Sequence, residues 1–214
     1  SWSLTGHSAE ELSKKFTEMQ DDSEVTAGFM WQKTTRESKK YQLRGEILSF
    51  IPVDKNVEIM LVTITNTGRM AQTVTPTAAI PLYGRSADNI RDHRHVTSLL
   101  HRIETTDTGV LVTPTLSFDE RGHQVNHMTY YCVGWSGNGE KPVDFYPTAE
   151  DFVGEGGNFE RPYAIVKNAE GVKAGTKIEG LEAVGGLHFS EITLEPEEEC
   201  SYLNFTGITE DIQE

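Results

Sequence analysis

Short apolar stretches of strand length recur along most of this chain. They are rich in Val, Ile, Thr, Tyr and Phe, and Gly, Pro, Asn or Asp residues separate each stretch from the next. They predict β-strands at residues 25–31, 41–51, 57–65, 72–82, 96–104, 110–116, 127–135, 164–167, 187–194 and 201–206. No long apolar repeat of 3.6 residues follows residue 24, so the pattern predicts an all-β fold of antiparallel sheets packed face to face as a β-sandwich.

The stretch at residues 57–65 indicates where the centre of a sheet lies. Its sequence, VEIMLVTIT, puts apolar side chains on both faces of a strand, as expected for a central strand of a layered sandwich. The turns Asn66-Thr67-Gly68 and Asp107-Thr108-Gly109 contain residues that tolerate positive φ, and they predict two hairpins.

Residues 142–158 predict a long excursion over the surface. They contain two prolines and three glycines and have no sustained periodicity. Aromatic residues on and just after this excursion can either stack on sugar rings or attach the loop to the sandwich, and attachment is favoured for each taken alone. These residues are Phe145, Tyr146, Phe152 and Phe159.

The beginning of the chain has a helical pattern instead. Ser8 is a suitable N-cap with Glu11 three residues later, and Leu12, Phe16 and Met19 recur at helical spacing. We therefore expect a helical lead-in over residues 1–24 and one β-sandwich domain over residues 25–214, since no repeat or change in composition marks a further boundary.

Charge and cysteine content narrow the class of protein. The formal net charge of -14 argues against a nucleic-acid partner, which would select a basic surface. Cys132 and Cys200 fit neither a disulfide framework nor the spacing of a metal site. No signal-peptide pattern and no apolar run near 20 residues is found, so we expect a cytoplasmic protein without a membrane partner.

The densest polar cluster lies within residues 80–102, IPLYGRSADNIRDHRHVTSLLHR. Arg, Asp, Asn and His side chains beside Tyr83 can hydrogen-bond the hydroxyls of a sugar while the tyrosine stacks on its ring. A solvated loop with local ion pairs explains the same residues equally well. The residues predicted to bind substrate are Arg85, Asp92, His93, Arg94 and His95.

A metal site is the weaker interpretation of this cluster. His93 and His95 would share one side of an extended strand, but Arg91 and Arg94 would repel a cation and a third ligand is missing. A neutral ligand rich in hydroxyl groups suits these residues better. The chain also lacks the G-x-S-x-G, P-loop, dinucleotide-binding and H-E-x-x-H motifs, so no catalytic residue is assigned.

Three segments in their order along the chain resemble one enzyme family. They are ILSFIPVDKNVEIMLVTITNTGRMAQTVTPTAAI from residue 47, DFVGEGGNFERPYAIVKN from residue 151 and AVGGLHFSEITLEPEEECSYLNFTGIT from residue 183. Together they are similar to the N-terminal β-sandwich of the inverting glycoside phosphorylases of glycoside hydrolase family 94, which include cellobiose, chitobiose and 1,2-β-oligoglucan phosphorylases. The segment ADNIRDHRHVTSLLHR is most similar to the 1,2-β-oligoglucan phosphorylases of this family.

The resemblance implies a supersandwich of the galactose-mutarotase type. In the parent enzymes an (α/α)₆ barrel carries the general acid, and inorganic phosphate is the co-substrate without any further cofactor. That barrel is absent from this chain, so we expect the domain by itself to be inactive. The implied partners are an oligosaccharide, the barrel of the parent chain and a second copy in a homodimer.

The resemblance also implies a role for the polar cluster. The family's Phe-Gln-Arg-like stretch, which contacts the acceptor sugar, falls on Asp92-His93-Arg94. Arg94 matches the arginine, whereas His93 replaces the amide residue and Asp92 the aromatic one. The acceptor sugar of this chain is therefore left open.

Two other classes of function remain. An aldose epimerase on the same fold would need a carboxylate base opposite a histidine acid, for which the candidates are His93, His95, His101 and Glu155. A carbohydrate-binding module would need only the sandwich and its aromatic residues. Mutarotation would favour the first, and sugar binding without turnover the second.

Overall fold

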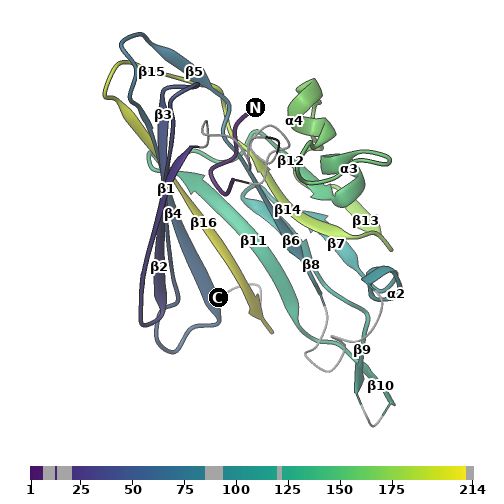
Figure 1. Cartoon of the computed structure of the whole chain (residues 1–214). Helices are drawn as coiled ribbons and strands as arrows, with labels where there is room; N and C mark the ends of the chain where they lie inside the picture. Colours follow the sequence, from purple (N-terminus) through teal and green to yellow (C-terminus); the bar gives the residue numbers. More distant parts are fainter. Residues whose placement is uncertain (7–12, 14–20, 85–93, 120–121, 211–214) are drawn as a thin grey trace.

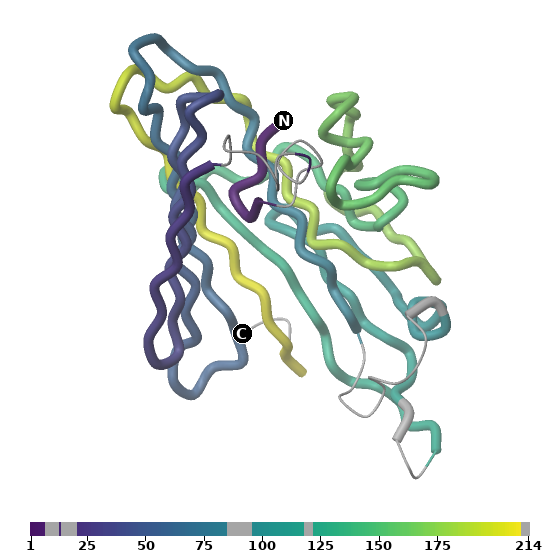
Figure 2. Tube along the Cα trace, in the orientation of Figure 1, coloured from purple at the N-terminus to yellow at the C-terminus, as the bar shows by residue number. Residues whose placement is uncertain are grey.

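The computed structural model describes residues 1–6, 13, 21–84, 94–119 and 122–210 (Figures 1 and 2). The helix that the sequence predicts around residues 8–19 lies outside this part of the chain, apart from Ser13. The described residues confirm an all-β fold of antiparallel sheets in two layers.

The first layer is a nine-stranded antiparallel sheet with the order β1-β2-β3-β4-β16-β11-β8-β7-β13. In chain order its strands are β1 (Asp22–Gly28), β2 (Trp31–Ser38), β3 (Leu43–Phe50), β4 (Val57–Asn66), β7 (Arg102–Thr105), β8 (Gly109–Val112), β11 (Thr129–Ser136), β13 (Lys177–Glu179) and β16 (Glu199–Thr209). β4 is the fourth of the nine, and most of its residues are half-buried, which confirms the central strand predicted from its two apolar faces.

The second layer is a three-stranded sheet of β12 (Asp144–Thr148), β14 (Ala183–His188) and β6 (Thr77–Leu82), with β14 in the middle. It packs against β11, β8 and β7, so it covers only one half of the large sheet. The core between the layers includes Phe145, Leu187 and Val110, each at most 2% exposed. Two short helices, α3 (Ala149–Val153) and α4 (Tyr163–Lys167), lie on the outer face of this second sheet (Figure 1).

The other half of the large sheet, β1 to β4, is not covered by a second sheet in the described part of the chain. Every residue of β1 is exposed. The first residues of the chain approach this half, where Leu4 packs directly over Gly45 and leaves no room for a Cβ at that position. Figure 2 shows this terminal segment between the uncovered strands and the helices.

The remaining strands form two small sheets of two strands each. β5 (Gln72–Val74) pairs with β15 (Ile192–Leu194), and β9 (Leu116–Asp119) pairs with β10 (Gly122–Val125). The β9–β10 hairpin projects from the body at the end of the molecule that carries the helix α2 (Arg94–Ser98) (Figure 1).

Three of the local predictions failed at segments that contain a helix of only five residues, which is too short to show a helical period. Residues 96–104 were predicted as one strand, but α2 ends at Ser98 and β7 begins at Arg102. Residues 164–167 belong to α4, which follows Pro162 and ends at Asn168 in the left-handed conformation. The excursion at residues 142–158 contains β12, whose five residues are all buried, and α3, which Thr148 caps by accepting a hydrogen bond from the Asp151 amide.

The helices α2, α3 and α4 are also far shorter than the roughly 20 apolar residues that cross a bilayer. Each has five residues, and no candidate for a membrane-spanning helix is found among the described residues.

One of the two predicted hairpins forms. The turn at residues 107–109 joins β7 to β8, which pair with Thr105 opposite Val110. The turn at residues 66–68 is instead a corner, because β4 pairs with β3 and β16 whereas β5 pairs with β15.

Asn66 builds this corner and is fully buried, at 0% exposure. Its Nδ2 donates to the carbonyls of Met70 at 2.8 Å and Leu194 at 2.9 Å, and its Oδ1 accepts from the Gly68 amide at 2.8 Å. One side chain therefore satisfies three backbone groups where the chain leaves the large sheet for β5 and β15.

We predict that Asn66→Ala lowers the free energy of unfolding by about 3 kcal/mol, because it leaves buried backbone groups without partners. Urea unfolding monitored by circular dichroism measures this change. Asn138→Ala, at an exposed loop position, is the control and should stay within about 0.5 kcal/mol of the parent chain. A loss below about 1 kcal/mol in Asn66→Ala would contradict the role assigned to the corner.

Candidate functional site

The structure describes only part of the predicted substrate-binding set. Arg85, Asp92 and His93 lie outside the described residues, so their predicted role is untested. Arg94 and His95 are the first two residues of α2. The extended strand on which His93 and His95 would have shared one side does not form at His95, because the backbone is helical from Arg94 to Ser98.

A narrow notch lies beside α2, where the second sheet ends. Its wall combines residues from the end of β6, the C-terminal half of α2, the start of β14 and the loop after α3. Its volume is about 20 Å³. The polar and aromatic residues that line it are Tyr83, Thr97, Ser98, His101, Phe159 and Glu182.

His101 is the most deeply placed ionisable residue of this notch, at 4% exposure. Its Nδ1 lies 3.1 Å from the Leu181 carbonyl oxygen. Because a carbonyl only accepts hydrogen bonds, Nδ1 carries the proton in this contact. Nε2 is buried, and the backbone of Gly84 lies close to the ring.

The environment of His101 favours this neutral ring. Burial lowers the pKa of His101 below its ordinary value of 6.5, and it outweighs the backbone groups of Leu181 and Gly84 and the charge of Glu182, which act in the opposite direction. At neutral pH the ring of His101 is therefore uncharged.

A second, wider hollow lies between α3, α4 and the segment at residues 169–172. It has a volume of about 520 Å³ and is open to solvent. Tyr146 and Tyr163 line it together with four carboxylates, Glu150, Asp151, Glu155 and Glu170. Glu155 thus lines a different hollow from His101, and the described residues do not bring these two epimerase candidates into one concave face.

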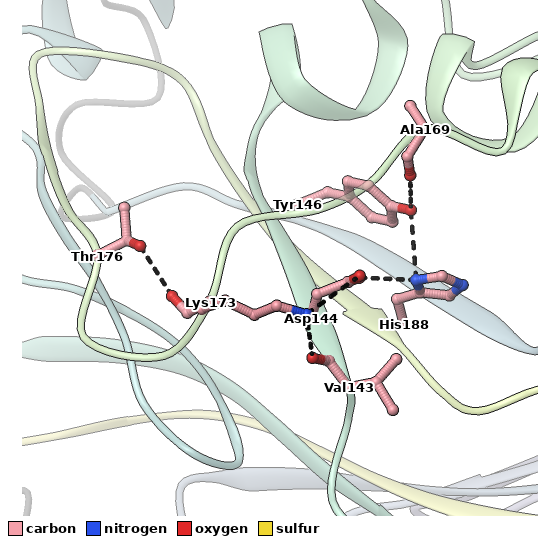
Figure 3. Close-up of polar contacts among 7 residues, drawn as sticks. All are labelled: Val143, Asp144, Tyr146, Ala169, Lys173, Thr176 and His188. Atoms are coloured by element: carbon pink, nitrogen blue, oxygen red, sulfur yellow. Dashed lines mark hydrogen bonds and ion pairs between the residues drawn. The ribbon is translucent and has the colours of Figure 1, made fainter.

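A polar network beneath this segment was not predicted (Figure 3). Asp144 Oδ1 lies 2.6 Å from His188 Nδ1, and the Tyr146 hydroxyl donates to the Ala169 carbonyl at 2.7 Å. Burial and, secondly, the charge of Asp144 raise the pKa of Tyr146 to about 12, so its hydroxyl remains a donor. Asp144 and His188 are register partners on β12 and β14.

Lys173 extends this network to the segment at residues 169–173. Lys173 Nζ donates to the Val143 carbonyl at 3.1 Å and lies 4.0 Å from Asp144 Oδ2. Its contacts therefore tie β12 and β14 to the segment at residues 169–173. No local motif could have revealed it, since Asp144 and His188 are 44 residues apart.

The described ranges hold neither a cluster of metal ligands nor a disulfide. No three His, Cys, Asp or Glu side chains gather there in a way that would hold a metal ion. Cys132 and Cys200 are both free, and burial raises the pKa of the Cys132 thiol to about 12. Cys132 therefore stays protonated at neutral pH.

The burial of His101 predicts a defined pH dependence of stability. As the pH falls below 6.5, the unfolded chain takes up a proton at this histidine before the folded chain does. Protonation thus favours unfolding, and the stabilisation linked to neutral His101 is lost as the pH drops through its folded pKa. In His101→Asn, which keeps a side-chain donor for the Leu181 carbonyl, this dependence is removed.

We therefore expect the difference in unfolding free energy between the parent chain and His101→Asn to shrink from about pH 7.5 to about pH 5. Urea unfolding at a series of pH values measures it. His123→Asn, at an exposed position of β10, is the control. A pH-independent difference at His101, or an equal pH dependence in the control, would refute the prediction.

Comparison with known protein families identifies the family to which this chain belongs. The family model described as "Glycosyl hydrolase 94, supersandwich domain" matches residues 1–214. No curated protein matches the chain. The match spans every strand of both layers, in agreement with the two-layered antiparallel architecture. The chain therefore belongs to glycoside hydrolase family 94, of which it forms the supersandwich domain.

Proposed function

We propose that this domain serves a glycoside phosphorylase that cleaves a β-glucosidic bond with inorganic phosphate and inverts the anomeric centre to give α-glucose 1-phosphate. The observation that carries the proposal is the family match over residues 1–214. Inversion requires one protein acid, because phosphate takes the place of the activated water of an inverting hydrolase. Gluco-oligosaccharides with 1,2-β linkages are the first substrates to test, and the cytoplasm is the proposed location because the phosphorylated product is used there.

In this proposal the domain orients the acceptor sugar and transfers no proton. A barrel in the parent enzyme supplies the general acid, and inorganic phosphate is the only co-substrate. The guanidinium group of Arg94 offers several N–H donors to sugar hydroxyls, and fixing an acceptor in a reactive orientation lowers the entropic part of the barrier. The position of Arg94 at the start of α2, the helix that also lines the notch, supports this role.

We expect Arg94→Ala to raise the KM for the acceptor about tenfold or more in the enzyme that contains this domain, with a smaller effect on glucose 1-phosphate, because a charge-assisted hydrogen bond is lost. Phosphate release from glucose 1-phosphate, with glucose, sophorose or cellobiose as acceptor, measures this effect.

Arg69→Ala is the matched control, since Arg69 is an exposed arginine in the corner between β4 and β5. An unchanged acceptor KM in Arg94→Ala would refute the role of Arg94. An enzyme without phosphorolysis in either direction would refute the proposed function itself.

The proposal includes a homodimer, which an apolar surface at one end of the large sheet supports. Phe29 is 90% exposed at the tip of the β1–β2 hairpin, and Val53 is 78% exposed in the turn between β3 and β4. The two tips are neighbours, because the Ile51 amide donates to the Met30 carbonyl at 3.0 Å. Apolar side chains at adjacent tips are typical of a surface that is buried in a partner.

We predict that Phe29→Ser weakens dimerisation about tenfold or more and leaves the stability of the monomer nearly unchanged, because the side chain is exposed in the single chain. Sedimentation velocity over a range of concentrations measures both species. Met70→Ser removes another exposed apolar residue, 70% exposed, and is the control. A monomeric parent chain, or equal dimerisation of the Phe29 variant, would refute this part of the proposal.

A further inference from the structure

The large sheet has a back face, which points away from the second sheet. Val62 of β4, Tyr202 of β16 and Cys132 of β11 point the other way and belong to the core between the layers. Because side chains alternate along a strand, the residues next to them in each strand lie on the back face. The second sheet, with α3 and α4 on it, lies on the opposite side (Figure 1). The back face therefore has no second layer among the described strands and helices.

Two rows of residues cross the back face from β2 to β11. Within each row the residues are direct register partners on neighbouring strands. The first row is Trp31, Phe50, Ile59, Phe205 and Val133, and the second row is Lys33, Leu48, Leu61, Leu203 and Trp135. We call the apolar residues of these two rows the back-face band.

The back-face band is not buried by any core of this chain. None of its residues belongs to either hydrophobic core that the described residues form. Trp31 is 42% exposed, and the other members are half-buried. The uncovered face of an antiparallel sheet normally carries polar side chains. Five neighbouring strands that carry apolar ones instead indicate a surface that a partner covers.

The aromatic residues of the band are held in place within the single chain. The rings of Trp135 and Phe205 meet edge to face, with centroids 5.7 Å apart. The ring of Trp31 lies directly over Gly28 and leaves no room for a Cβ there. Aromatic side chains that are already ordered lose little conformational entropy on binding, and such residues often dominate the energy of an interface.

The distribution of charge favours a second copy of this chain as the partner. At a formal net charge of -14, two copies repel each other over most of their surfaces. Lys33 is the single charged residue of the two rows, and it forms an ion pair with Glu46. Two copies can thus bring their bands together without placing carboxylates opposite each other. An apolar band is also complementary to itself, as a two-fold interface requires.

The position of the band extends the apolar surface at the hairpin tips. The first row begins at Trp31, which directly follows the tip that carries Phe29, and Phe50 lies three residues before Val53. Across five strands the band is about 20 Å long, and its two rows are about 7 Å apart. This is the size of an interface centre, and the tips add to it toward the roughly 800 Å² that each partner buries in a standard interface.

We propose that the back-face band packs against the same band of a second copy, sheet on sheet, about a two-fold axis. Two sheets packed in this way lie about 10 Å apart and bury the apolar side chains of both faces. The choice of a second copy rests on the homodimer of the proposed function. The band itself follows from register and burial alone.

The test is sedimentation velocity of this chain over a range of concentrations, with tryptophan emission measured on the same dilutions. We expect a dimer with a Kd on the order of 10 µM. Two of the three tryptophans of the chain, Trp31 and Trp135, belong to the band, so emission should shift to longer wavelength as the dimer dissociates. A chain still monomeric at about 500 µM, or a dimer whose dissociation leaves the emission unchanged, would overturn the proposal.

Variants locate the contact on the band. Leu61→Thr and Leu203→Thr each remove apolar surface and keep a side chain suited to a strand, so each should weaken dimerisation about tenfold or more. Val125→Thr, at a position of β10 that is 64% exposed, is the control and should dimerise as the parent chain does. Urea unfolding shows that each variant is folded, and two band positions are used so that one folded variant suffices.

The outcomes separate this proposal from the proposed function. A dimer that Phe29→Ser dissociates but both band variants leave intact would overturn the proposal, because the hairpin tips alone would then form the contact. A loss in Val125→Thr equal to that in Leu61→Thr would overturn it as well. Dimerisation through the band in an enzyme without phosphorolysis would support the present proposal and refute the phosphorylase activity, whereas phosphorolysis by an enzyme whose domain stays monomeric would do the reverse.

Discussion

The packing of a three-stranded sheet on only half of a nine-stranded sheet determines the rest of this structure. Phe145 and Leu187 from the small sheet meet Val110 from the large one in a core that is closed to solvent. One half of the large sheet is thereby left without a second sheet in the described residues, which accounts for the exposed tips of its hairpins. The small sheet in turn offers an outer face for α3 and α4 and an end where the notch forms.

The fold class could be predicted because burial on a sheet leaves a local pattern. Most residues of β4 are half-buried, and its sequence shows this directly in the apolar side chains on both faces. The boundaries of strands were predicted wrongly where this pattern of buried positions is absent. Residues 25–31 were predicted as one strand, yet the chain turns at Phe29 and Met30, and Met30 adopts φ 62° where a glycine or asparagine would be expected. A turn made of apolar residues cannot be recognised from the sequence pattern.

The candidate site could be predicted only as separate residues. The sequence singled out Tyr83, His101 and Phe159 one by one, without indicating that they line one notch. Phe159 and Glu182 reach the same notch from segments about 75 to 100 residues further along the chain, and only the pairing of β14 with β6 brings Glu182 there. The partners Asp144 and His188 depend on the register of β12 against β14 in the same way. Long-range register is what the sequence could not supply.

The helix α2 joins the proposed sugar contact to the notch. Arg94 begins this helix, and Thr97 and Ser98 near its end line the notch. An arginine can only donate hydrogen bonds, whereas the oxygen of a hydroxyl group can accept them. The proposed role of Arg94 therefore requires a ligand rich in oxygen atoms, which a sugar is.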